Sequence, residues 1–270
     1  MQNRNAVLRI HYLQSLLMFV AAYCLLQLNS QLLTIYISRD FYIDVTWYFS
    51  QLEFDPALTA PYVSTDTRMT VVMAAPIVSL LVGLVFLLVY MVERSGRLWV
   101  NYFFFWGFIH GFNHFFGMLA MSSFTETELV VATHLYNVGW HTRLIFATTG
   151  VFLLFIIGWN TGHIVLIKTG RFFEENRRLR LRFLMASTLL PMFSAGIILM
   201  ILNTLSRHWH FWWLVSLSIA IVPAFFRYMM PIAEKPVQQK YRYRFSWGIT
   251  TLCIIFVATY FIITQNGIKI

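Results

Sequence analysis

Runs of apolar residues, each long enough to cross a lipid bilayer, alternate along the chain with shorter polar segments. A membrane-spanning helix needs roughly 20 apolar residues, because the hydrocarbon core is about 30 Å thick and each helical residue rises about 1.5 Å. The pattern predicts an all-α fold, a polytopic membrane helical bundle that forms a single integral membrane domain over residues 1–270. The seven predicted transmembrane helices cover residues 11–38, 70–92, 98–121, 141–167, 183–205, 211–230 and 245–265.

The composition agrees with a chain that lies mostly in lipid. Hydrophobic residues make up 59% of the 270 positions and charged residues 11%, whereas soluble domains have about 25% charged residues. The net charge of +9 would suggest nucleic acid as a partner of a soluble protein, but here the basic residues stand in short loops between apolar runs. We therefore expect the lipid bilayer as the surrounding medium and no nucleic-acid partner.

The basic residues also predict the orientation, because loops on the cytoplasmic side carry an excess of Lys and Arg. With the N-terminus inside, fifteen of the twenty basic residues lie in cytoplasmic segments and five lie outside. The acidic residues show the opposite bias, since seven of the eleven fall in the outer segments. Seven spans, with the N-terminus in and the C-terminus out, agree with the charge of every loop. A bacterial cytoplasmic (inner) membrane is the expected location.

Two extramembrane segments are large enough to bear on function. The outer segment 39–69 is acidic and aromatic; we expect a short helix or a hairpin that lies against the membrane surface and offers a site for a membrane or periplasmic protein partner. The basic inner loop 168–182 ends in a run of arginines and is expected to begin a helix that faces anionic headgroups. A further apolar stretch, 129–140, is interrupted by polar residues and predicts an interfacial or partly re-entrant helix.

The placement of histidine is the most informative chemical feature, because six of the eight histidines fall in the middle or outer part of the predicted bundle. His110 and His114 are four residues apart, so they share one face of an α-helix, and His141 opens the next span on the outer side. These imidazoles are candidate ligands of a transition metal (zinc, iron or copper) with an open position for chemistry. The alternative is that they hydrogen-bond neighbouring helices beside Asn113 and Asn137.

The second apolar run resembles a helix of a known protease family. Residues 73–84 read Met-Ala-Ala-Pro-Ile-Val-Ser-Leu-Leu-Val-Gly-Leu, which is similar to the Ala-Gly-Pro-x-x-Asn-x-x-x-Ala helix of the site-2 protease-like intramembrane metalloproteases. In that family the small residues and the proline allow close packing against the catalytic helices. Residues 112–117, Phe-Asn-His-Phe-Phe-Gly, are similar to the family's Asn-x-x-Pro segment, so the resemblance covers about residues 20–120.

The chain lacks the zinc-binding motif of that family. Where the family has His-Glu-x-x-His, residues 27–31 read Gln-Leu-Asn-Ser-Gln, and the aspartate that supplies the third zinc ligand has no counterpart. The resemblance therefore implies a degenerate relative without protease activity. It also implies that Gln27, Gln31 and Thr34 form a polar stripe inside the bundle, joined by hydrogen bonds.

Three functions remain open. The first is a non-catalytic scaffold or partner subunit of a membrane complex, indicated by the lost zinc motif and the aromatic outer segment. The second is a membrane metalloenzyme or cofactor-binding redox protein that uses the histidine cluster in the outer half of spans three and four. The third is a transporter in which Arg143 and the buried histidines line a polar path, although no two halves of the chain look alike. The polar positions expected in the interior are Gln27, Gln31, Asn113, Asn137 and Arg143.

Overall fold

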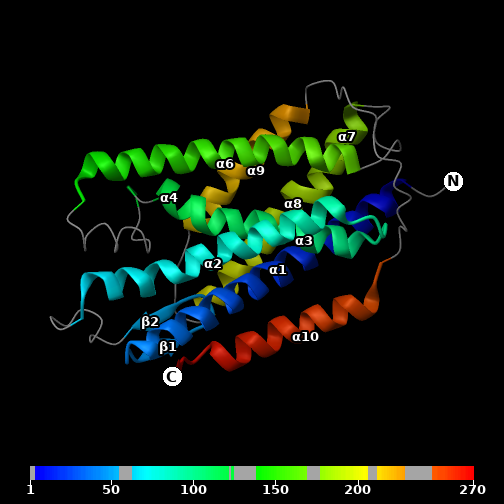
Figure 1. Ribbon diagram of the computed structural model, residues 1–270. Helices are drawn as coiled ribbons and strands as arrows, with labels where there is room; N and C mark the ends of the chain where they lie inside the picture. The colour runs from blue at the N-terminus through cyan, green and yellow to red at the C-terminus, as the bar shows by residue number, and fades with distance from the viewer. Residues whose placement is uncertain are drawn as a thin grey trace.

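The apolar runs of the sequence are helical wherever the structure, a computed structural model, describes them (Figure 1). The described residues are 4–54, 63–121, 123–124, 138–168, 177–205, 212–228 and 245–270. Two π-helical turns, η2 and η4, interrupt the α-helices. In chain order the elements are α1 (Arg4–Asp40), β1 (Val45–Trp47), β2 (Leu52–Phe54), α2 (Thr65–Val92), α3 (Leu98–Phe112), η2 (Asn113–Gly117), α4 (Met118–Met121), α6 (Trp140–Lys168), α7 (Arg177–Leu184), η4 (Met185–Leu189), α8 (Leu190–Leu205), α9 (Trp212–Tyr228), α10 (Trp247–Thr264) and β3 (Ile268–Lys269).

Five helices are long and apolar enough to cross a membrane, as judged by length and composition in the described residues. Two further helical segments fill the remaining apolar runs: α3 continues through η2 and α4, and α9 is a shorter apolar helix. The chain is thus an all-α protein with helices suited to a membrane. The predicted interfacial helix over 129–140 lies outside the described residues, except for its last three positions.

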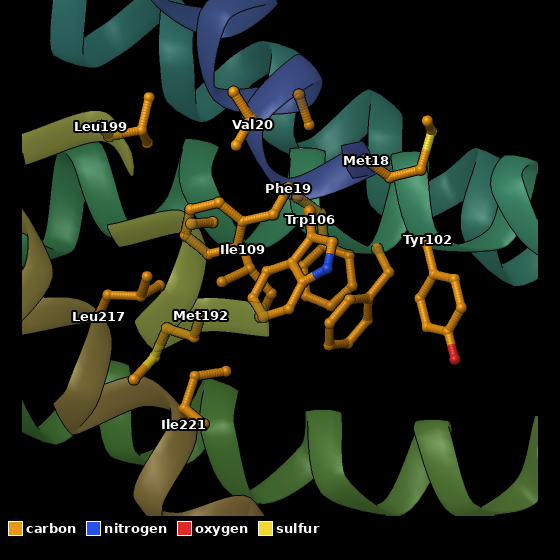
Figure 2. Packing of buried hydrophobic residues seen from close by; sticks show 14 of the residues in the cluster. Met18, Phe19, Val20, Tyr102, Trp106, Ile109, Met192, Leu199, Leu217 and Ile221 are labelled. Carbon is orange, nitrogen blue, oxygen red and sulfur yellow. The ribbon is translucent and has the colours of Figure 1, made fainter. Parts of the chain in front are cut away.

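Helix α1 lies at the centre of the arrangement and packs against α2, α3, α8 and α10. In Figure 1, α6 and α9 lie on one side of α1, α2 and α3, and α10 lies on the other side. The centre of the core is aromatic: Phe19 of α1 meets Trp106 of α3 edge to face, with ring centroids 4.6 Å apart. Met192 of α8 and Leu217 of α9 belong to the same buried cluster as these two rings (Figure 2). Residues from four segments far apart in sequence therefore share one core.

Small residues bring α6 and α9 into close contact. A Cβ added to Gly158 would lie 1.7 Å from the carbonyl oxygen of Ala220, and one added to Gly162 would lie 2.7 Å from the Cα of Ala224. These glycines are four residues apart in α6, as are the alanines in α9. Helix association within lipid relies on van der Waals packing, so small residues that let backbones approach are typical of such interfaces.

Helices α2 and α3 are joined in the same way. A Cβ on Gly111 would lie 2.5 Å from the carbonyl oxygen of Ser79 and 2.6 Å from the Cα of Gly83. The two helices therefore touch backbone to backbone at this point.

A small antiparallel sheet closes one end of the molecule, with strand order β2-β1-β3. Strands β1 and β2 form a hairpin within the segment 39–69, and a hairpin is one of the two forms that the sequence predicts for it. Residues near the C-terminus supply the third strand, where Thr46 pairs with Lys269 and Trp47 with Ile268. The chain beyond α10 is thereby held at the same end of the bundle as the connection between α1 and α2.

The close approach of α6 and α9 predicts different effects for two glycine substitutions. Gly158→Ala should lower the free energy of unfolding by roughly 1–3 kcal/mol, because the new methyl group overlaps the Ala220 carbonyl. Gly248→Ala is the matched control, since a Cβ there meets nothing within 4 Å. Unfolding curves of both variants in detergent micelles would measure the difference, and equal effects would contradict the packing described.

Candidate functional site

His110 lies in the aromatic core, buried between three helices. Its ring centroid is 4.3 Å from that of Phe19 and 5.6 Å from that of Tyr23, both on α1, and 6.3 Å from that of Trp213 on α9. Only 5% of the side chain is exposed. The environment of this imidazole is therefore a box of aromatic rings within the bundle.

His114 has different neighbours from His110. Its Nδ1 lies 2.7 Å from the Ser79 hydroxyl on α2, a hydrogen bond between two helices. The expectation that both histidines share a face assumes an unbroken α-helix, but His114 belongs to the π-helical turn η2. The i→i+5 bonding of such a turn holds an extra residue, so side chains four apart no longer stack one above the other.

The structure does not assemble the predicted metal ligands. His141 is exposed in the first turn of α6, next to the ring of Trp140. No three His, Cys, Asp or Glu side chains among the described residues, which include all three candidate histidines, lie close enough together to hold a metal ion.

Asn113 connects the start of η2 to α9. Its Nδ2 donates a hydrogen bond of 2.9 Å to the carbonyl oxygen of Trp213, which also accepts one of 3.0 Å from the Ser216 hydroxyl. The helices approach so closely here that a Cβ on Gly117 would lie 2.5 Å from the Ser216 oxygen. Of the other predicted interior residues, Arg143 is half-buried in the first turn of α6, and Asn137 lies outside the described residues.

Gln31 is the most fully bonded of the predicted polar residues, and it is buried on α1. Its amide oxygen accepts from the Trp47 indole at 2.8 Å, and its amide nitrogen donates to the carbonyl of Tyr48 at 3.2 Å. The Tyr260 hydroxyl of α10 lies 2.5 Å from the same amide oxygen and 2.9 Å from the Phe49 carbonyl, two acceptors that share its single proton. One side chain thus joins α1, the hairpin and α10.

Gln27, one turn before Gln31, extends this connection. Its Nε2 donates to the carbonyl of Ser50 at 2.8 Å. Three consecutive carbonyls of the hairpin turn, 48–50, therefore receive hydrogen bonds from side chains of α1 or α10. Thr34 instead donates to the carbonyl of Ser30 within its own helix, at 2.9 Å. We call the segment 40–54 together with β3 the outer platform, after the side of the membrane on which the sequence predicts it to lie.

A second polar cluster lies at the opposite half of α1 and was not anticipated from the sequence. The Trp106 indole donates to the Ser15 hydroxyl at 2.8 Å, and that hydroxyl donates to the carbonyl of Ser187 at 2.6 Å. Nearby, His11 Nδ1 lies 2.6 Å from the Tyr102 hydroxyl. Ser187 belongs to the π-helical turn η4, which apolar periodicity does not reveal. The spacing of His11 and Ser15, four apart in an apolar run, was the available signal.

The double role of Ser15 predicts an unusually sensitive position for a serine. Ser15→Ala should lower the free energy of unfolding by about 2–3 kcal/mol, because a buried indole N–H and a buried carbonyl both lose their partner. Ser218→Ala is the control, since that hydroxyl bonds only the Leu214 carbonyl of its own helix and should change stability by less than about 0.5 kcal/mol. Chemical unfolding measures both free energies. Equal losses of stability in the two variants would contradict the two hydrogen bonds of Ser15.

The side-chain contacts of α1 described above fall into three groups: the Ser15 hydrogen bonds, the aromatic box around His110, and the glutamines beneath the outer platform. Each group joins α1 to at least two other segments. Comparison with known protein families, curated proteins and solved structures finds no match to this chain.

Proposed function

We propose that the chain is a non-catalytic scaffold or partner subunit of a membrane complex, which presents the outer platform to a partner protein. The observation that carries the proposal is the bonding of Gln31. A buried amide in a membrane helix is costly unless it is satisfied, and such residues usually mark a site in the bundle. Here its polar atoms hydrogen-bond an extramembrane hairpin and α10. These bonds hold the hairpin in one position, as a surface that binds a partner protein requires.

The proposal includes seven spans, with the N-terminus in the cytoplasm and the C-terminus outside a bacterial inner membrane. Pairing of β1 with β3 requires an even number of crossings between the end of α1 and the end of α10. Among the residues that the structure describes, six helical segments lie in that interval: α2, α3 to α4, α6, α7 to α8, α9 and α10. With α1 they make seven, in agreement with the bias of basic residues to the cytoplasmic loops.

The surface of the platform suits a protein partner with basic character. The outer segment 39–69 has five acidic and two basic residues. Asp40, Asp44 and Glu53 are exposed on it, and Tyr42 is 94% exposed. Aromatic side chains surrounded by charge are typical anchors of protein interfaces. The hydrogen bonds beneath keep this surface in one conformation, so little ordering is required on binding.

We further propose that the chain is a degenerate relative of the site-2 protease-like family. Gln27 and Gln31 stand where that family has its zinc-binding histidines, and both amides bond the hairpin turn. The small residues Ser79 and Gly83 of α2 pack backbone to backbone on Gly111 of α3, as the family's second helix packs on its neighbours. A relative that lost its metal would keep this framework and use the amides structurally.

The topology predicts which introduced cysteines react from outside the cell. In a chain with Cys24 and Cys253 replaced by alanine, Tyr42→Cys and Lys269→Cys should react with a membrane-impermeant maleimide in intact cells. Arg94→Cys and Arg182→Cys should react only after permeabilisation. All four positions are exposed. Reaction at positions 42 and 94 from the same side would contradict the topology.

The scaffold function predicts a partner whose retention depends on Gln31. Gln31→Leu removes the shared bonds of the platform and should abolish stoichiometric co-purification of the partner, as well as its photo-crosslinking to a probe at position 42. Asn29→Leu is the control, because Asn29 is exposed two residues away on the same helix. A probe at Ile254, exposed on α10, should not capture the partner.

Two results would overturn the scaffold function. One is equal partner capture by the Gln31→Leu and Asn29→Leu variants. The other is a purified protein that holds a stoichiometric metal, without a partner, and loses the metal on His114→Ala.

A further inference from the structure

Three polar atoms in the aromatic box have no hydrogen-bond partner among the described residues. They are His110 Nε2, Asn113 Oδ1 and Trp213 Nε1. Their side chains are 5%, 2% and 7% exposed, respectively. Polar groups buried to this degree nearly always have a partner, either protein or ordered water. Three such atoms in adjoining residues point to one shared partner.

The three residues occupy one small region where α3, η2 and α9 meet. His110 and Asn113 are three residues apart, so they are neighbours on the same helix face. The ring centroid of Trp213 is 6.3 Å from that of His110, and its carbonyl oxygen accepts from Asn113 Nδ2 at 2.9 Å. The region lies at the first residue of a π-helical turn, a distortion that is frequent at functional sites.

The hydrogen-bonding character of the three atoms is complementary to a water molecule. The indole N–H of Trp213 can only donate, and the amide oxygen of Asn113 can only accept. The His110 ring also hydrogen-bonds the backbone of Phe19; a ring that donates through one nitrogen presents the other as an acceptor. The set therefore calls for one acceptor and two donors, which a single water molecule provides.

We propose that His110, Asn113 and Trp213 form a binding site for one buried water molecule, which links α3, η2 and α9. The water accepts from Trp213 Nε1 and donates to Asn113 Oδ1 and to His110 Nε2. None of the three side chains is an acid or a strong base, so the site suits a neutral ligand. An internal water typically makes about three hydrogen bonds to buried polar groups, as this one does. The site is independent of the outer platform and of any partner.

A double-mutant cycle tests the shared ligand. His110→Phe and Asn113→Leu should each lower the melting temperature by about 3–6 °C, because either one leaves polar atoms without their water. The double variant should lie no lower than the worse single variant, since the water is already lost. The control cycle pairs His110→Phe with Ser216→Ala, because Ser216 bonds the Trp213 carbonyl but leaves no unpaired atom; its effects should add.

Solid-state NMR in lipid bilayers gives a direct measurement of the water itself. Magnetisation transfer from water protons to the [15N]His110 ring, assigned by its loss in His110→Phe, is expected in the unaltered protein. The transfer should disappear in Asn113→Leu. Should His110→Phe fail to fold, Trp213→Phe replaces it in the cycle and the His110 signal is assigned by sequential labelling.

Two outcomes would overturn the site. Additive melting shifts for His110 and Asn113 would show that they share no ligand. Water transfer that is missing in the unaltered protein, or that survives Asn113→Leu, would show that no water is held by this set.

Discussion

Polar groups that leave water must find partners inside the protein, and α1 is where this requirement bears most heavily. The helix packs against most of the bundle and has buried polar side chains near both of its ends. Ser15 bonds α3 and η4, while Gln31 bonds the hairpin and α10. Between them the contacts are aromatic and apolar. Each bond is directional, so the two polar ends determine the rotation and height of α1 relative to its neighbours, which apolar contacts alone leave undetermined.

The helices of the bundle are joined by two kinds of contact. The pairs α2–α3 and α6–α9 are joined by glycine and other small residues, which give close backbone contact. The contacts of α1 instead use hydrogen bonds and aromatic rings. The segment α3–η2–α4 takes part in both kinds, because it packs on α1 and α2 through α3 and on α6 and α9 beyond it. The π-helical turn lies at this change of partners.

The length of the apolar runs was enough to place the helices, because lipid imposes a minimum length that soluble cores do not. The seven ranges and the observed helices agree within a few residues at most ends, although α1, α2 and α7 begin earlier. The candidate site was harder to foresee. His110 and His114 are four apart, but a π-helical turn separates their neighbours, and nothing in the apolar pattern indicates such a turn. Tyr260 reads as an ordinary residue near the end of a span, since its partner Gln31 is 229 residues away in sequence. The spacing of Gly158 and Gly162, by contrast, can be recognised in the sequence, because two small residues four apart in an apolar run are typical of a helix contact. In the structure both glycines lie at the contact with α9.

The pairing of β1 with β3 also affects the order in which the protein can be assembled. The hairpin is synthesised early, yet its third strand and the Tyr260 hydroxyl come more than two hundred residues later. Until then Gln31 lacks one of its partners and one edge of β1 is unpaired, so the sheet is completed only when the last helix is in place. The platform is thus complete only after every intervening helix has been synthesised. A partner that recognises only the finished platform would therefore bind fully assembled molecules and leave incomplete chains unbound.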